Sequence, residues 1–110
     1  MLAVKDVPCT LTLQFFIRDG KLHQIASMRS SALIFGISYD VPAFTFFQEM
    51  FANELNVELG TYVHISNSLH VYERHFDMLN KIANLQSYSS IPMNRMPNNV
   101  HMAIPHLIDE

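Results

Sequence analysis

The sequence predicts an α+β domain in which a mixed β-sheet carries packed helices. Three observations indicate this class. Residues 10–29 have the composition of two strands around an Asp-Gly turn, residues 41–56 carry the three- and four-residue apolar period of a helix, and a further strand (61–69) and helix (71–86) follow. Two strands, a helix, a strand and a helix in this order favour a mixed α+β architecture.

The first two strands are expected to form a β-hairpin. Thr10–Ile17 is mostly β-branched, aromatic or aliphatic, which suits a pleated and largely buried surface. The turn is expected at Asp19-Gly20, because glycine accepts the positive φ that a tight turn demands. Lys21–Arg29 then alternates loosely. Its expected inward face consists of Leu22, Gln24, Ala26 and Met28.

The helix expected over residues 41–56 carries a broad apolar stripe. Asp40 precedes it as a candidate N-cap, and Pro42 would be tolerated in its first turn. Such a stripe can form a partner groove, but an amphipathic helix more commonly packs it against its own core. The residues expected in that core are Phe44, Phe47, Phe51 and Leu55.

The rest of the chain is expected to be a strand, a second helix and a tail. Gly60 is expected in a turn before a strand over residues 61–69. The helix over residues 71–86 would then face inward through Val71, Phe76, Leu79, Ile82 and Ala83. Because prolines interrupt the pattern after that, residues 87–110 are expected to form an irregular tail.

The composition bounds the class of protein. The chain has 110 residues, 49% hydrophobic and 15% charged, which suits one compact domain over residues 1–110 and argues against disorder. A net charge of −3 without a basic run argues against duplex nucleic acid or an anionic membrane as a partner. The longest run free of Asp, Glu, Lys and Arg, Leu59–Tyr72, is shorter than the ~20 residues of a membrane span. The single cysteine excludes an internal disulfide and suits a reducing cytoplasm.

Five residues stand out as candidates for chemistry, each with a plainer structural explanation. Cys9 follows a proline at the mouth of a strand, and Arg29 would favour its thiolate if the hairpin brings the two together, although a lone cysteine is more often a small buried side chain. Arg29 and Ser30 combine donors suited to phosphate. His70 and Tyr72 are two residues apart, so both could bond one sugar. Taken singly, these last four are more often explained as solvent-exposed or partly buried element ends.

No metal site is expected. Among the six histidines, His64, His70 and His75 have no cysteine partner and no regular pairing with a carboxylate. A hydrolase pair of Cys9 with a histidine stays open, without a local signature to support it.

The order of these motifs resembles thymidylate synthase and, more broadly, the superfamily that thymidylate synthase forms with deoxycytidylate hydroxymethylase. The match runs from Pro8 to about His75 without an insertion, and it begins near the middle of a family enzyme, so the family's N-terminal half has no counterpart here. The matching motifs are Pro8-Cys9, Gln14-Phe15, Asp19-Gly20-Lys21-Leu22, Arg29-Ser30, Gly36, Leu59-Gly60 and His70-Val71-Tyr72.

The resemblance implies a pyrimidine nucleotide C5 one-carbon transferase. Cys9 would add to C6 of the base and so activate C5 toward the one-carbon unit of 5,10-methylenetetrahydrofolate. Arg29 and Ser30 would hold the 5′-phosphate. The sugar 3′-hydroxyl would be bonded by His70 and Tyr72, and Gln14 would lie on the strand that leaves the nucleophile. A homodimer is expected by the same resemblance.

Asp40 stands where thymidylate synthases have asparagine, whose amide matches O4 and N3–H of uracil. A carboxylate accepts well from the N4 amine of cytosine and lacks a donor for O4. The resemblance therefore favours a cytidylate hydroxymethylase-like reaction, with dCMP or CMP favoured over dUMP as the substrate. Uridylate methylation is the alternative within the enzyme class. A catalytically silent nucleotide-binding remnant is the alternative outside it, because Thr10 and Ala32 replace a histidine and an aspartate of the family pattern.

Overall fold

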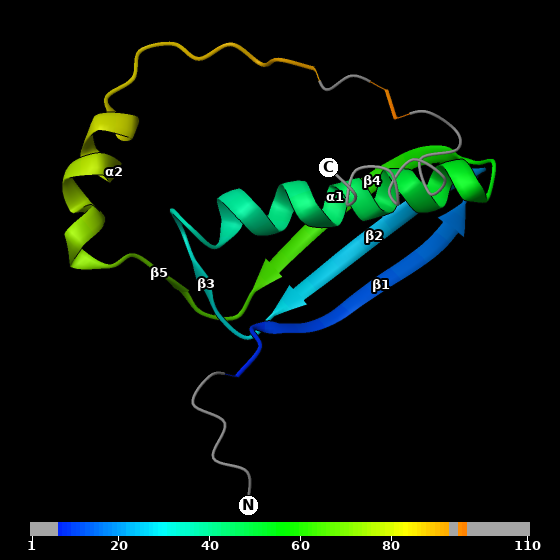
Figure 1. The fold of residues 1–110 in the computed structure, drawn as a ribbon, viewed down its shortest axis with the longest axis horizontal. Coiled ribbons are helices and arrows are strands. Elements are labelled where there is room, and N and C mark those ends of the chain that lie inside the picture. Colours follow the sequence, from blue (N-terminus) through cyan, green and yellow to red (C-terminus); the bar gives the residue numbers. More distant parts are fainter. Residues whose placement is uncertain (1–6, 93–94, 97–110) are drawn as a thin grey trace, which may run out of the picture.

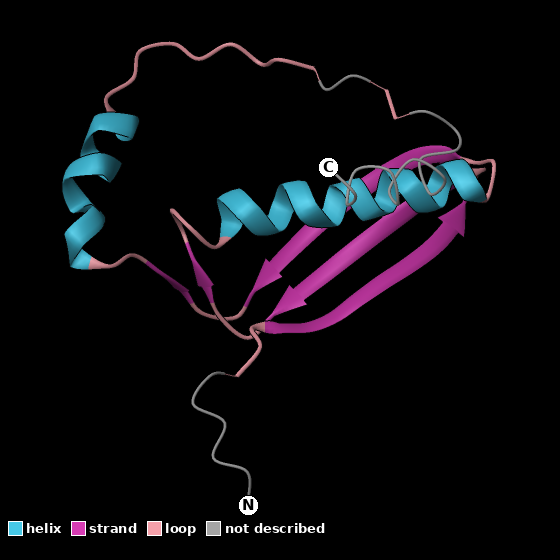
Figure 2. Cartoon of the chain, viewed as in Figure 1, coloured by secondary structure: helices cyan, strands magenta, loops and turns pink. Residues whose placement is uncertain are grey.

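The computed structural model describes residues 7–92 and 95–96, and it has the predicted α+β architecture (Figures 1 and 2). A three-stranded sheet has the order β1-β2-β4, and a separate parallel pair joins β3 to β5. The elements are β1 (Thr10–Arg18), β2 (Lys21–Met28), β3 (Ser31–Ala32), α1 (Ile37–Glu54), β4 (Glu58–Ser66), β5 (Leu69–His70), the 3-10 helix η1 (Glu73–His75) and α2 (Phe76–Ala83).

The expected hairpin is confirmed. β1 and β2 pair antiparallel, and Asp19 and Gly20 both adopt positive φ at the turn, 53° and 73°. The alternation of β2 is also confirmed, since the four residues expected to face inward are all buried while their neighbours are not. These buried residues are Leu22, Gln24, Ala26 and Met28.

The third strand of the sheet runs parallel to the second. A parallel connection needs a crossover, and α1 supplies it by crossing the face formed by β2 and β4 (Figure 1). The helix packs on that face through Phe44, Gln48 and Ala52, which lie one turn apart and are buried. The Nε2 of Gln48 donates to the carbonyl of Leu22 at 2.9 Å, which ties the helix to β2.

The expected limits and core stripe of this helix are wrong. The helix begins at Ile37, so Asp40 lies within its first turn rather than before it, and Pro42 lies inside the helix. Only Phe44 of the predicted stripe is buried. Phe47 and Phe51 are 41% and 40% exposed, and Leu55 is also exposed. The reason is that the sheet contacts the row of residues spaced four apart that contains Phe44, whereas Phe47 and Phe51 lie to one side of this row.

The strand expected over residues 61–69 is shifted in the structure. β4 begins at Glu58, where the N–H of Glu58 donates to the carbonyl of Gly20 at 3.0 Å and the register with β2 begins. Gly60 therefore lies within the strand, and the turn expected there falls earlier, at Asn56 with φ 53°. Pairing with β2 sets where β4 begins, and the local amino-acid composition carries no information about that pairing.

The second helix is shorter than expected and packs differently. Instead of one helix over residues 71–86, the chain forms η1 and then α2, and no residue of either is buried. Phe76 and Ile82, expected to face inward, are each 50% exposed. Figure 1 shows α2 apart from the three-stranded sheet, so this amphipathic helix has no sheet face to cover.

The described part of the predicted tail, residues 87–92 and 95–96, has no helix or strand. The rest of the predicted tail, residues 93–94 and 97–110, lies outside the described residues. Within the described ranges, no helix is both long and apolar enough to cross a membrane.

Candidate active site

A cavity of about 330 Å³ opens at the end of the sheet where β1 begins and β2 ends. It contains six of the seven side chains that the sequence singled out for catalysis or nucleotide binding, contributed by four separate segments of the chain. Its lining residues are Cys9, Arg29, Ser30, Ser31, Ala32, Gly36, Asp40, His70 and Tyr72.

Backbone hydrogen bonds bring these segments together. The N–H of Arg29 donates to the carbonyl of Cys9 at 2.9 Å, which closes the open end of the hairpin. β3 then pairs with β5, placing Ala32 opposite His70. The N–H of Leu33 donates to the carbonyl of His70 at 2.9 Å. Two stretches of chain about forty residues apart therefore meet at the cavity.

Arg29 anchors the segment that carries the cysteine. Its guanidinium donates through Nε to the carbonyl of Pro8 at 3.0 Å and through a terminal nitrogen to the carbonyl of Val7 at 2.7 Å. Cys9 itself is a free, exposed thiol. Because arginine has five N–H donors, these two bonds leave others available to an anion in the cavity, whose lining Arg29 shares with Cys9.

His70, Ser30 and Tyr72 form a polar corner of the cavity. Ser30 Oγ and His70 Nδ1 are 3.3 Å apart, within hydrogen-bonding distance. The ring of Tyr72 meets that of His70 edge-on, with centroids 5.2 Å apart, and the guanidinium of Arg74 lies 4.8 Å above the tyrosine ring. Tyr72 is about half exposed, so its hydroxyl is accessible to a ligand.

Asp40 approaches the cavity from the first turn of α1. Its N–H donates to the carbonyl of Gly36, the N-cap residue of the helix, at 2.8 Å. The negative charge of Asp40 adds to burial in raising the pKa of Tyr62, a β4 residue beneath the helix, to about 12. Tyr62 therefore stays protonated at neutral pH.

Gln14 is the one predicted site residue that the structure leaves outside the cavity. It pairs with Ile25 in the middle of β1, and its side chain is exposed. Side chains alternate between the two faces of a strand. The β2 residues that face α1 are Leu22, Gln24 and Ala26, and Ile25, the partner of Gln14, lies between two of them. Gln14 therefore lies on the face of the sheet opposite α1. Gln14 does lie on the strand that leaves Cys9, as the resemblance implies, and its role in substrate binding stays a prediction.

Ser31 is a cavity residue that the sequence analysis missed. It is 3% exposed, and its hydroxyl has no hydrogen-bond partner among the described residues. A single serine next to Ser30 gave no pattern that could have distinguished it. Gly36 was noted only as part of a motif, yet its missing side chain admits the backbone of Ala32 to the cavity wall.

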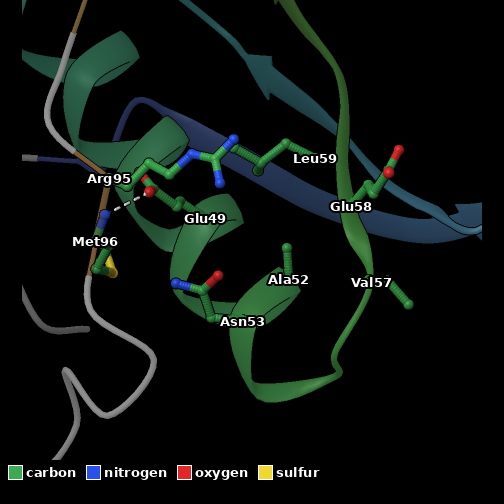
Figure 3. A pocket seen from close by; sticks show the side chains of 8 residues that line it. All are labelled: Glu49, Ala52, Asn53, Val57, Glu58, Leu59, Arg95 and Met96. Carbon is green, nitrogen blue, oxygen red and sulfur yellow. Dashed lines mark hydrogen bonds between the residues drawn. The ribbon is translucent and has the colours of Figure 1, made fainter.

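A second cavity, of about 430 Å³, lies near the other end of α1 and contains none of the predicted site residues (Figure 3). Its wall includes the tail, where the N–H of Met96 donates to Glu49 at 2.8 Å. The described residues include no cluster of three or more metal-ligating side chains.

Comparison with known proteins agrees with the fold. A family model described as thymidylate synthase matches residues 2–104. The chain belongs to the thymidylate synthase family. The thermostable thymidylate synthase A from Bacillus subtilis is similar in structure, with a TM-score of 0.76 and 27% sequence identity. The match covers 86% of this chain and 35% of that one, so the chain spans about a third of the length of this thymidylate synthase.

Proposed function

We propose that this thymidylate synthase-family chain carries the nucleotide-binding and nucleophilic part of a pyrimidine nucleotide C5 one-carbon transferase. The observation that carries the proposal is the convergence of a free thiol, an arginine, a carboxylate and the His70-Tyr72 pair in one cavity. Outside this cavity, no other described group of residues combines a nucleophile with donors for phosphate and sugar.

Each side chain has a role that its chemistry supports. The Cys9 sulfur adds to C6 of the base, which makes C5 nucleophilic. The 5′-phosphate binds the free N–H donors of Arg29 and the hydroxyl of Ser30. His70 and Tyr72 bond the sugar. A nucleotide substrate and a reduced thiol both suit the cytoplasm.

The one-carbon donor has a suitable neighbouring surface. Methylenetetrahydrofolate would supply the carbon unit that C5 attacks. An apolar groove of about 590 Å³ shares the 33–40 segment with the cavity and is lined by Leu33, Ile34, Phe35, Ser38, Tyr39, Leu79 and Ile82. The rings of Phe35 and Tyr39 lie there with centroids 6.5 Å apart and planes inclined by 27°, and such an aromatic surface suits a flat aromatic group.

Asp40 favours cytidylate, dCMP or CMP, over uridylate. Its carboxylate accepts from the N4 amine of cytosine but has no donor for O4 of uracil. The cytosine N3 then needs a proton, carried by the base or by the carboxyl. Uridylate methylation is the alternative within the family, and it requires a protonated Asp40 to donate to O4.

A silent nucleotide-binding protein is a second candidate, and Ala32 favours it. This small side chain lines the cavity and offers no carboxylate for proton transfer, whereas the family pattern has an aspartate at this position. The cavity would then bind a nucleotide without converting it.

A second copy of the chain is the proposed protein partner. On the sheet face turned away from α1, Val63 and Ile65 are 41% and 44% exposed, and Val63 pairs with Ile25 of β2. An open apolar sheet face of this kind is typical of an interface between two copies.

Tritium release from C5-labelled nucleotides tests the proposal. With methylenetetrahydrofolate, the chain is expected to release tritium from dCMP and not from dUMP, and Cys9→Ser is expected to abolish release while leaving nucleotide binding intact. Release from dUMP alone would favour uridylate methylation. Binding without release from either nucleotide, in folded protein, would favour the silent binding protein.

A further inference from the structure

A hydrogen-bonded pair of side chains lies under the helix that carries Asp40. Tyr62 and His64 are two residues apart on β4, so both point to the same face of the sheet, and both are partly buried. The Tyr62 hydroxyl and Nδ1 of His64 are 2.7 Å apart, and the ring centroids are 6.1 Å apart. Neither residue lines the nucleotide cavity.

Asp40 lies at the cavity end of the same buried helix row. Asp40, Phe44 and Gln48 are spaced four residues apart on α1, so they share the face turned toward the sheet. Phe44 packs in one apolar cluster with Ala26 and Met28, and Tyr62 packs against that cluster. Tyr62 therefore packs against the cluster that contains Phe44, which is one helical turn along α1 from Asp40. Burial and, after it, the charge of the Asp40 carboxylate raise the pKa of this tyrosine.

The direction of the Tyr62–His64 hydrogen bond follows from the available partners. Within the described residues, the Tyr62 hydroxyl forms its hydrogen bond with His64. The Nε2 of His64 is buried and has no hydrogen-bond partner there. If Nδ1 carried the ring proton and donated to the tyrosine, the phenolic O–H would have no acceptor. Donation from Tyr62 to an unprotonated Nδ1 leaves the hydroxyl satisfied, with the ring proton on Nε2.

We propose that His64 is a positioning residue for base recognition, because it accepts the Tyr62 hydroxyl proton and so keeps that hydroxyl from bonding the Asp40 carboxylate. This inference rests on the proposed binding of cytidylate. Asp40 recognises the N4 amine only as a hydrogen-bond acceptor, and a neighbouring O–H donor would occupy the same lone pairs. With the phenol directed to His64, the carboxylate stays free for the base.

Two measurements on the 110-residue chain test this arrangement. The first is the tautomer of His64, read from ¹⁵N NMR shifts of the ligand-free protein, which is expected to show an unprotonated Nδ1. The second is calorimetric binding of dCMP to variants. His64→Leu removes the acceptor and is expected to weaken dCMP binding about tenfold, the effect of one competing hydrogen bond to a charged group.

Matched variants separate this role from a merely structural one. His64→Asn keeps an acceptor at the position of Nδ1 and is expected to restore affinity to within about twofold of the parent protein. In a Tyr62→Phe background, which has no hydroxyl to compete, His64→Leu is expected to change dCMP affinity by less than about twofold. A packing defect caused by His64→Leu would persist in that background.

The outcomes distinguish this inference from the proposed function. A protonated Nδ1 would overturn the positioning role, as would dCMP binding that His64→Leu leaves unchanged or that the Tyr62→Phe background fails to rescue. In each of these cases the nucleotide site itself would stand. Failure of the folded parent chain to bind either dCMP or dUMP would overturn the site and the positioning role together.

Discussion

The substitution Gly36→Ala tests whether the cavity wall depends on a close approach between two backbone segments. Gly36 precedes α1 with φ −79° and ψ −70°, an ordinary right-handed conformation, so alanine brings no backbone strain of its own. A Cβ at this position would lie 2.6 Å from the carbonyl oxygen of Ala32 and 2.8 Å from its nitrogen. Both atoms belong to backbone that β5 holds in place, so no flexible side chain can move aside.

The expected cost is about 3 kcal/mol of unfolding free energy, at the upper end of what overpacking costs in a well-packed region. Nucleotide binding should weaken as well. The N–H of Asp40 donates to the Gly36 carbonyl at 2.8 Å, so a shift of the Gly36 backbone would also displace Asp40. Gly20→Ala is the matched control. Gly20 has φ 73° and nothing within 4 Å of the added Cβ, so alanine there costs only the left-handed conformation, about 1 kcal/mol.

Urea denaturation followed by circular dichroism measures both variants under the same conditions. The reasoning would be refuted if Gly36→Ala lost no more stability than Gly20→Ala. It would also fail if Gly36→Ala were strongly destabilised but bound dCMP like the parent chain, because the cavity would then not depend on this contact.

Three further predictions concern the buried polar groups and the open sheet face. Gln48→Met should cost about 1–3 kcal/mol of unfolding free energy in urea, because it removes the donor to the Leu22 carbonyl. Gln24→Met should be neutral or stabilising, because it replaces a fully buried amide that has no partner among the described residues. Folding raises the Tyr62 pKa from 10.0 to about 12, so the stability contributed by its neutral form is complete below pH 10 and is lost as the pH rises toward 12. Urea midpoints should show this loss in the parent chain but not in Tyr62→Phe. Ile65→Lys should weaken self-association in sedimentation experiments by at least about tenfold without unfolding the chain, because it buries a charge in the proposed interface; an unchanged sedimentation coefficient would place the interface elsewhere.

The sequence was most informative where one periodicity had one explanation. The alternation in β2 identified its buried face correctly, because a strand has only two faces and one of them meets α1. The stripe on α1 was harder. Phe44 and Phe47 fit the same apolar period, and only the position of the sheet decides that the row through Phe44 is buried. Phe51 instead meets Phe15 edge-on, with ring centroids 5.1 Å apart, at the side of the helix.

Predicting the cavity depended on the order of motifs rather than on local pattern. Cys9 and His70 are far apart in the chain, and only the family resemblance predicted that they lie together. The structure places both residues in the lining of one cavity. Gln14 lies on the expected strand but outside the cavity lining, because a motif position says nothing about which face of a strand a side chain occupies. Ser31 could not be found, because burial of a single hydroxyl is a property of the assembled fold.

The short pairing of β3 with β5 has a consequence for how the site opens. The β3–β5 ladder has two residue pairs, Ser31 with Leu69 and Ala32 with His70, whereas β1, β2 and β4 form long ladders. Local unfolding costs less free energy where few backbone bonds must break, so this pair should exchange its amide hydrogens well before the large sheet does. A nucleotide that bridges Arg29 and His70 would bind only the closed form. Slower exchange at the N–H of Leu33, which donates to the His70 carbonyl, would then report occupancy of the site directly.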